Sequence, residues 1–438
     1  MFQGADVDAL DGMAGRCELA SAAADGCRTT LAAATTAPWV FGPFGAAFTA
    51  YLSREAVLCL DTVAEALRRF AVVLRAHAEA QRRASAGDSV PVLSRYTSPV
   101  SQRTPYDQRI RDCRAQISAE LDRRRAELAD LERRHAPAKQ IEQARRRIAT
   151  YERLLAPERQ IILFDPTGDG AVAELHGMIG PKTRNVGVLV PGTTTDIDNF
   201  DGFSQRGRTF VDASPDGDLA VIVWMGGDLP DKLVSDAPSQ RYADDLGPKL
   251  ADFSRDLRQE ISADVPAATG VHVTVAGHSY GGAVVGTAER FGLDADRVLH
   301  IESAGMGHGV DGPEEYHNPR PDVRRYSMTA PGDPIGLTQG VTIGSIGHGT
   351  DPDEFPGVTR LDTGRYADGR RVEGVAAHGG VFEPGSDAWR NMHEVLVGGT
   401  VTQHQEWQLT PRFVPGPFPR VDWDEVPPKD PPKRIDIP

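Results

Sequence analysis

The 438-residue chain has little sulfur and no long uninterrupted apolar run. Its four cysteines all lie at or before position 113, and their spacing fits neither a CxxC metal site nor a redox pair. No stretch reaches the roughly 18 consecutive apolar residues of a membrane-spanning helix. The first residues also lack the basic start and apolar core of a secretory signal. We therefore expect no integral membrane segment and no export by that route.

Basic residues are in the minority, since 48 Lys and Arg face 62 Asp and Glu and the net charge is −14. This charge repels the phosphates of nucleic acids and anionic membrane surfaces, so we expect no nucleic-acid partner. Hydrophobic residues make up 40% of the chain, and the mean hydropathy is −0.36. The composition is that of a globular protein with two or three domains.

Motifs for metals and cofactors are missing: there is no HExxH, no P-loop and no dinucleotide-binding fingerprint. Asp196, Asp198 and Asp201 are spaced like calcium ligands, but the twelfth position of that loop is Gly207. A calcium loop needs a bidentate Glu there. We expect neither a metal nor a cofactor.

The first 86 residues predict a helical hairpin. Stretches 6–34 and 44–85 are rich in Ala and Leu, and apolar residues recur at helical spacing in the second. The intervening segment contains Pro38 and Pro43, which break a helix. We expect a hairpin over residues 1–86.

A linker and a second hairpin are expected next. Residues 87–105 gain Ser and Pro and lose the helical periodicity, as a linker does. Residues 106–156 carry an apolar stripe among alternating Arg and Glu, interrupted at Pro137, which predicts a hairpin with charged outer faces. We expect residues 1–156 to offer surfaces for a helical partner or for self-association.

The pattern changes after Pro157 and predicts an α/β domain over residues 157–410. Short apolar runs bounded by Gly and Pro alternate with helical stretches, as in parallel βα units. Seven runs predict strands, at 160–164, 185–190, 219–224, 272–276, 297–301, 324–329 and 358–361. Residues 411–438 hold nine prolines, and we expect an extended tail there.

One short motif carries chemistry: Gly277-His278-Ser279-Tyr280-Gly281 matches G-x-S-x-G. An apolar strand precedes it and a helix of small residues follows, which is the context of a nucleophile elbow. The glycines at 277 and 281 leave room for the tight turn, and the turn exposes the Ser279 hydroxyl. The following helix N-terminus supplies positive potential to a developing oxyanion.

A serine nucleophile needs a base and an orienting acid. Counting strands from the nucleophile strand, the loop after residues 324–329 contains Asp333, and the loop after residues 358–361 reaches His378. These positions predict Asp333 as the acid and His378 as the base.

Other histidines follow Ser279, and chain order argues against most of them. His348 is the main competitor, because it also follows Asp333, but it precedes the last predicted strand. The remaining downstream candidates either precede the acid or fall in or next to a predicted helix: His300, His308, His317, His393 and His404. His278 is expected to pack the turn.

The second oxyanion donor is expected from the loop after residues 185–190. Gly192 permits close approach of the backbone, so we assign the Thr193 N–H beside the Tyr280 N–H. A simple turn of threonines remains the alternative.

Several segments together resemble an actinobacterial α/β-hydrolase family of unknown function, across residues 158–400. They include VLVPGTTTDIDNF, VAGHSYGG, APGDPIG and HGGVFEPGSDAWRNM. The resemblance implies a mainly parallel sheet flanked by helices, a Ser-Asp-His triad at Ser279, Asp333 and His378, and a distant likeness to cutinases and lipases. The front hairpin resembles the WxG-type proteins of type VII secretion, although here Trp39-Val40-Phe41-Gly42 places glycine one residue late.

These observations predict a serine hydrolase that cleaves carboxylic esters of a small molecule or a lipid. Two alternatives stay open: an amidase or peptidase with the same triad, and a secretion-linked interaction protein with a hydrolase fold. We expect a cytoplasmic location, or export by a type VII-like route. Segments 226–242 and 302–322 are either a cap over the site, lined by Met225, Leu229, Met306 and Tyr316, or ordinary surface loops.

Overall fold

A computed structural model describes residues 105–437 except 233–235, 267–269, 338, 341, 344–345, 406–407, 415–419 and 427–430, together with the single residue Ala22. The chain divides into two compact units, residues 1–101 and 102–438, and the description below concerns the second. The expected hairpin over 1–86 lies outside the described residues, as does nearly all of the 87–105 linker.

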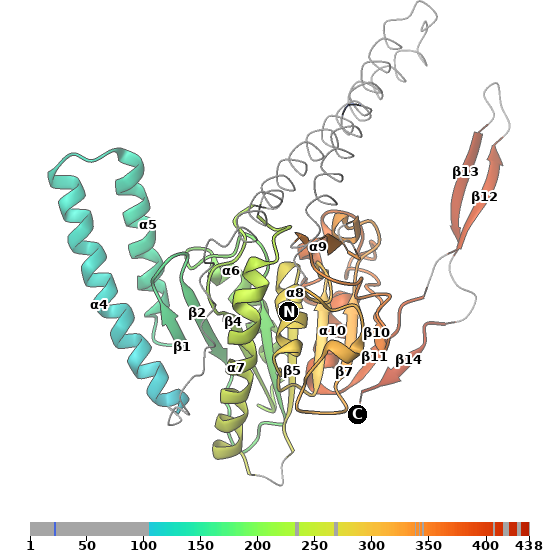
Figure 1. Cartoon of the computed structure of the whole chain (residues 1–438), viewed down its shortest axis with the longest axis horizontal. Coiled ribbons are helices and arrows are strands. Elements are labelled where there is room, and N and C mark those ends of the chain that lie inside the picture. Colours follow the sequence, from blue (N-terminus) through green and yellow to red (C-terminus); the bar gives the residue numbers. More distant parts are fainter. Residues whose placement is uncertain are drawn as a thin grey trace, which may run out of the picture. The chain divides into compact units, whose positions relative to one another are not determined.

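The second unit is built on an eight-stranded sheet with the order β1-β2-β4-β3-β5-β6-β7-β10 (Figure 1). The strands are β1 Gln160–Asp165, β2 Ala171–His176, β3 Asn185–Val190, β4 Leu219–Met225, β5 His272–His278, β6 Arg297–Ile301, β7 Arg324–Met328 and β10 Val358–Arg360. Strand β2 runs antiparallel to β1 and β4, and the pairs from β4 to β10 are parallel. The predicted parallel α/β architecture is therefore confirmed.

All seven predicted strands are present, and β2 was not predicted. Its sequence AVAELH is poor in the β-branched and aromatic residues that signal a strand, and every one of its residues is buried. Burial on both faces removes the alternation of polar and apolar residues from which a strand is otherwise predicted. The packing of β2 between β1 and β4 decides its conformation here.

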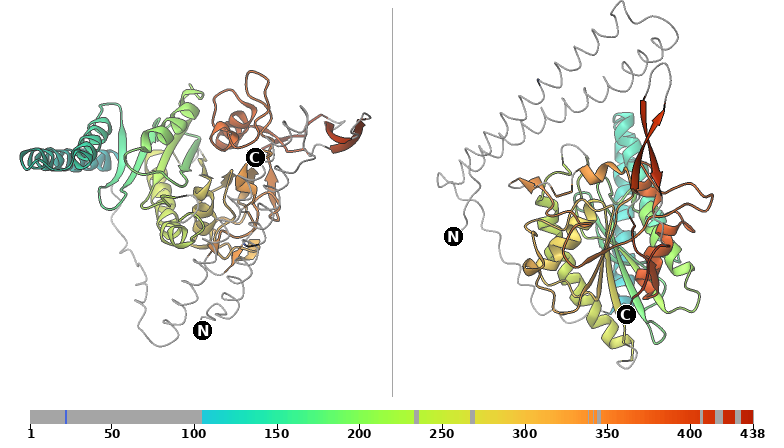
Figure 2. Two further views of the ribbon diagram at one scale, coloured as in Figure 1. Left: turned by 90° about the horizontal axis from the view of Figure 1, so that it is seen from above. Right: turned by 90° about the vertical axis from the view of Figure 1, so that its right-hand side faces the viewer.

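Helices cover both faces of the sheet (Figure 2). Helices α7 Arg241–Asp264 and α8 Tyr280–Arg290 lie together on one face, whereas α6 Phe200–Asp212 and α10 Asp387–Val397 lie on the other. The ring of Phe210 on α6 stacks on Trp389 of α10, with centroids 5.2 Å apart. Burial of both faces explains why β3 and β4 are almost continuously apolar.

Residues 106–156 form the predicted helical hairpin, α4 Tyr106–Arg133 and α5 Ala138–Leu154. We expected a domain apart from the α/β region, but the apolar stripe of the hairpin belongs to the same core as the sheet. Tyr151 of α5 meets Phe164 of β1 edge-on at 5.6 Å, and α4 packs against β1. The stripe is buried because β1 is an edge strand with a face to cover.

We expected an extended tail over residues 411–438, and parts of that segment pair as strands. Strands β12 Gln408–Val414 and β13 Arg420–Val426 pair with each other, and β14 Arg434–Asp436 pairs with β11 Thr400–Thr402. Ile437 is buried in the main core. A proline is tolerated in an edge strand because its missing N–H can face away from the partner, and Pro411 lies in such a two-stranded ribbon.

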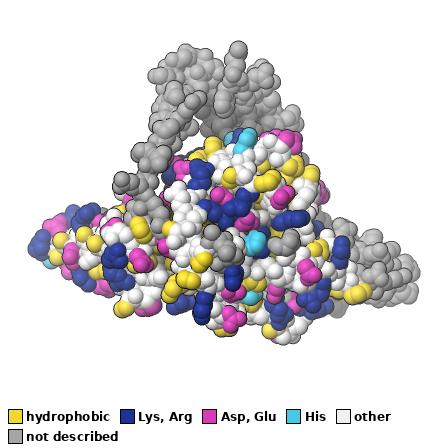
Figure 3. Space-filling model, turned by 90° about the horizontal axis from the view of Figure 1, so that it is seen from below, with side chains coloured by type: hydrophobic (Ala, Val, Ile, Leu, Met, Phe, Trp, Pro, Cys, Tyr) yellow, Lys and Arg dark blue, Asp and Glu magenta, His cyan; other side chains and the backbone are white. Residues whose placement is uncertain are grey.

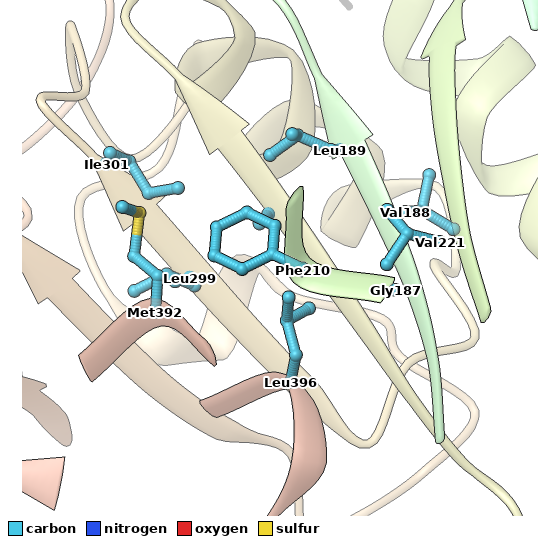
Figure 4. A pocket seen from close by; sticks show the side chains of 10 residues that line it. Gly187, Val188, Leu189, Phe210, Val221, Leu299, Ile301, Met392 and Leu396 are labelled. Carbon is cyan, nitrogen blue, oxygen red and sulfur yellow. The ribbon is translucent and has the colours of Figure 1, made fainter. Parts of the chain in front are cut away.

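Behind the centre of the sheet lies one small void of about 10 Å³ (Figure 4). Its lining is apolar and comes from the four strands β3 to β6 and from α6 and α10, with Leu189, Phe210 and Met392 among the side chains. It is a packing defect with space for no substrate. Among the described residues, no helix combines the length and the hydrophobicity required to cross a bilayer.

Candidate active site

Ser279 stands at the junction of β5 and α8, with φ +56° and ψ −123°. A non-glycine residue adopts this backbone only when its surroundings impose it. The Ser279 N–H donates to the Ile301 carbonyl at 2.9 Å, and the Ser279 carbonyl accepts from Ala304 N–H at 3.0 Å. The end of β6 therefore holds the strained turn in place.

Three glycines leave the space that this turn requires. A Cβ at Gly277 would lie 2.4 Å from the Gly281 carbonyl oxygen, and one at Gly281 would lie 2.4 Å from the Pro191 carbonyl oxygen. A Cβ at Gly192 would lie 2.7 Å from Ser279 Cβ. The strand, the serine and the loop after β3 can approach only because these positions lack side chains.

The loop after β3 and the start of α8 present backbone donors beside the serine. Tyr280 is the first residue of α8, so its N–H has no acceptor within the helix. Within the described part of the chain, neither the Tyr280 N–H nor the Thr193 N–H donates a hydrogen bond, whereas Thr194 N–H donates to Pro230 O at 2.7 Å. Both groups that we expected as oxyanion donors are thus free to bind a ligand.

Asp333 and His378 are brought together from separate loops. Asp333 follows β7, and His378 lies in the short helix α9 Ala377–Gly380. The His378 Nδ1 lies 2.8 Å from Asp333 Oδ2. The carboxylate is 2% exposed and the imidazole 31% exposed, so one side of the ring is open to solvent. In the described structure the Ser279 Oγ makes no hydrogen bond to this ring.

Burial raises the pKa of Asp333, but its hydrogen bonds outweigh burial and hold that pKa below its usual value. The donors are His378 at 2.8 Å and the Ile335 N–H at 2.9 Å. Asp333 is therefore an anion when its neighbours are in place, which is what an orienting carboxylate requires.

His278 fixes the loop that carries His378. Its Nε2 lies 2.7 Å from the His378 carbonyl oxygen, and the two ring centroids are 4.9 Å apart. Because a carbonyl only accepts, the Nε2 of His278 carries a proton. Burial, followed by the neighbouring His378 and Arg206, lowers the pKa of His278 well below its usual value. His278 is neutral and acts as a packing and hydrogen-bonding group, as we expected.

The other downstream histidines lie away from Asp333. His348 is buried, its Nε2 lies 2.7 Å from the Ala237 carbonyl oxygen, and burial lowers its pKa to about 4. His300 is fully buried, and burial lowers its pKa to about 3. His308 contacts Asp244 and His393 contacts Ser214. In the described structure none of these four histidines contacts Asp333, whereas His378 does.

Glu302 belongs to the same cluster and was missed from the sequence. It directly follows β6, is fully buried, and has φ +43°. The only signal was an acidic residue at the carboxyl end of the strand that follows the nucleophile strand. Strand order places the expected acid one strand later, at Asp333, and therefore does not point to Glu302.

The side chains suggested as cap lining are packed elsewhere. Met225 and Leu229 belong to the main core, and Met306 lies in a small separate core with Val310 and Phe355. The Tyr316 hydroxyl donates to the Met306 carbonyl at 3.3 Å. These four residues therefore stabilise the loops and do not line an open site.

A family model described as "Alpha/beta hydrolase" matches residues 165–341, which contain Ser279 and Asp333. The strand order and the elbow agree with it. The fold is that of an α/β hydrolase. Over these residues the chain is similar to a family of hydrolases.

Relatives in sequence are themselves uncharacterized. Two proteins of Mycobacterium tuberculosis, from strains CDC 1551 / Oshkosh and H37Rv, are each 28% identical over 289 residues. The match covers 58% of this chain and 42% of the relatives, so this chain spans less than half of their length. They show a similarity to mycobacterial proteins and name no activity.

The similar solved structures are distant. A dienelactone hydrolase-like promiscuous phosphotriesterase from metagenomic libraries is 15% identical, with a TM-score of 0.30, over 54% of this chain and 96% of its own. The 2,6-dihydroxy-pseudo-oxynicotine hydrolase is 13% identical, with a TM-score of 0.34, over 68% of this chain and 90% of its own. Similarities at this level identify neither a substrate nor a reaction.

Proposed function

We propose that the protein is a serine hydrolase that cleaves carboxylic esters, with Ser279 as nucleophile, His378 as base and Asp333 as orienting acid. The observation that carries the proposal is the 2.8 Å contact between His378 Nδ1 and Asp333 Oδ2. The ring of His378 lies 4.9 Å from that of His278, the residue before a serine held at φ +56°. A strained, glycine-flanked serine next to such a pair has the chemistry of acyl transfer.

The hydrogen bond to Asp333 fixes the tautomer of His378. A carboxylate only accepts, so the proton of the neutral imidazole is on Nδ1 and the lone pair is on Nε2. As the Ser279 Oγ attacks the carbonyl carbon of the ester, its proton passes to Nε2. The charge on Asp333 stabilises the imidazolium that forms.

The tetrahedral intermediate carries its negative charge on the former carbonyl oxygen. The N–H groups of Tyr280 and Thr193 are assigned to bind it, since both lack an acceptor in the described structure. His378 then returns the proton to the leaving alcohol, and the carbon–oxygen bond to that alcohol breaks. Water attacks the acyl-enzyme by the same route in reverse and releases the acid.

The test is labelling with a fluorophosphonate, which reacts with activated serines. We expect the wild-type protein to be labelled at Ser279 and Ser279→Ala to remain unlabelled. Ser303, a buried serine near the same strand ends, offers a matched control, and Ser303→Ala should still be labelled. Equal labelling of wild type and Ser279→Ala would defeat the proposal.

A comparison of turnover rates on an ester and on the matching amide tests which bond the enzyme prefers. The same three side chains support attack on either bond, but an amine is a poorer leaving group than an alcohol. We expect turnover of a p-nitrophenyl ester to exceed that of the matching anilide. A series of acyl chain lengths then separates a small ester from a lipid.

A further inference from the structure

Glu302 is a buried carboxyl group beside the buried Asp333, and the proposed reaction does not yet use it. One carboxyl oxygen of Glu302, one of Asp333 and one ring nitrogen of His378 all lie within 4.8 Å of one another. Glu302 follows β6 and Asp333 follows β7, so the pair joins the ends of two neighbouring parallel strands. The arrangement places a second acid directly behind the first.

Glu302 has few partners that would stabilise a negative charge on its carboxyl group. Its Oε1 accepts from Ala330 N–H at 2.9 Å, and its Oε2 contacts no donor among the described residues. Within the same part of the chain, no lysine or arginine forms an ion pair with it. Two adjacent carboxylates cannot both be ionised in such surroundings, because like charges repel and burial penalises each.

Asp333 is the better anion of the two. It receives hydrogen bonds from His378 and from Ile335 N–H, whereas Glu302 receives one from Ala330 N–H. Burial, followed by the adjacent Asp333, raises the pKa of Glu302 to about 10. Other titratable groups that face Glu302 are Asp353, which raises the pKa of Glu302 further, and Tyr366.

The backbone of Glu302 is also held in an unusual conformation. Its φ of +43° is in the left-handed region, and its N–H donates to the Met328 carbonyl at 2.7 Å. A residue with a side chain occupies that region at an energetic cost that neighbouring contacts must offset. This conformation turns the carboxyl group toward the loop that carries Asp333.

We propose that Glu302 is a positioning residue that remains a neutral carboxylic acid and donates a hydrogen bond to the Asp333 carboxylate. The bond fixes the orientation of Asp333, and through Asp333 that of the His378 ring. It also withdraws negative charge from the carboxylate, which tunes how strongly Asp333 stabilises the imidazolium. This inference rests on the proposed function only where it concerns turnover.

Two substitutions separate hydrogen bonding from packing. In Glu302→Gln the amide retains a donor for Asp333 and an acceptor for Ala330 N–H, whereas Glu302→Leu retains the size and loses both. We expect kcat of Glu302→Gln to stay within threefold of wild type. We expect kcat of Glu302→Leu to fall about 10- to 100-fold with KM nearly unchanged, because a hydrogen bond to a charged group is lost.

The pH profile distinguishes this role from a merely structural one. Without the donor, Asp333 holds more negative charge and favours the protonated imidazole, so the acid limb of kcat/KM in Glu302→Leu should move up by about half to one pH unit. At alkaline pH the wild type should lose activity as Glu302 ionises, while Glu302→Gln should not. Circular dichroism of both proteins checks that the fold persists at each pH.

An infrared measurement tests the proton without any substrate. Difference spectra between pH 7 and pH 11 should show the carbonyl band of a protonated carboxylic acid in the wild type and in Ser279→Ala, and no such band in Glu302→Gln. Failure of ester hydrolysis with this band present would defeat the proposed function alone. Absence of the band, equal kcat and acid limb in Glu302→Leu and wild type, or a Glu302→Gln as impaired as Glu302→Leu would overturn the inference.

Discussion

Two buried polar clusters in this fold differ in how their charges are balanced. In the β2 cluster the side chain of Arg159 bridges two carboxylates, and Glu174 also accepts from Ser204 Oγ; its members are Arg159, Glu174, His176, Asp201 and Ser204. In the β7 cluster two carboxyl groups meet without a guanidinium; its members are Glu302, Asp333 and His378. In the β2 cluster each carboxylate is paired with Arg159. In the β7 cluster the imidazole of His378 remains 31% exposed to solvent.

The difference separates charges that hold the fold together from charges that are available for chemistry. Burial raises the pKa of Glu174, but hydrogen bonds from Arg159 and the charge of its guanidinium outweigh burial and lower it. In the β7 cluster, burial and the neighbouring acid dominate instead and raise the pKa of Glu302. Unbalanced buried groups with shifted pKa values are typical of functional sites.

Asp333→Asn should produce the largest effect on activity and a small effect on stability. The amide can donate to His378 Nδ1 and thereby favour the wrong tautomer, so we expect kcat to fall about a thousandfold to ten-thousandfold. Initial rates on a p-nitrophenyl ester and thermal unfolding measure the two effects. An active Asp333→Asn would contradict the assignment of the acid.

The sequence predicted the apolar strands, the elbow and the Asp333–His378 pair, because each depends on local pattern and on strand order. It did not predict Glu302 or the β2 cluster, because both depend on which distant residues meet behind the sheet. Arg159 and Asp201 are 42 residues apart, and Glu302 and Ala330 are 28 apart. The packing of α4 and α5 on β1 was not predicted for the same reason. An amphipathic pattern indicates which face of a helix is buried, but not which element packs against that face.

Arg159→Met should have the opposite profile to Asp333→Asn. Removing the guanidinium leaves Glu174 buried without its cation, which costs about 3 to 5 kcal/mol of unfolding free energy. The site at the ends of β5 and β7 is untouched, so kcat of the folded protein should stay within about twofold of wild type. Urea unfolding and ester turnover at a temperature where the variant is folded measure the two quantities. A loss of turnover without a loss of stability would show that the clusters are coupled.

Mild acid should destabilise the protein through neutral buried histidines around the catalytic strand ends. Burial lowers the pKa of His278, His300 and His348, so the unfolded chain binds protons below about pH 6.5 that the folded chain does not. Their contribution to stability is full above that pH and is lost as pH falls toward the folded pKa values. Each should add up to about 1.4 kcal/mol per pH unit to the slope of unfolding free energy.

Urea unfolding at pH 7, 6 and 5 measures this slope, and His348→Gln should reduce it. His135→Gln, at an exposed histidine between α4 and α5, serves as the matched control and should keep the wild-type slope between pH 7 and pH 5. An identical slope in His348→Gln and wild type would show that His348 is not buried as a neutral group.

The exposed ion pairs should contribute least to stability. Basic and acidic side chains are interspersed over the surface in Figure 3, and Arg125 Nη2 on α4 lies 2.8 Å from Glu152 Oε1 on α5. Both side chains are about half exposed, at 53% and 50%, so water and salt screen the pair. We expect Arg125→Ala to cost less than about 1 kcal/mol, and the double-mutant cycle with Glu152→Ala to give a coupling near zero at high salt. A coupling as large as the Arg159→Met effect would mean that pairing, and not burial, gives the β2 cluster its stabilising role.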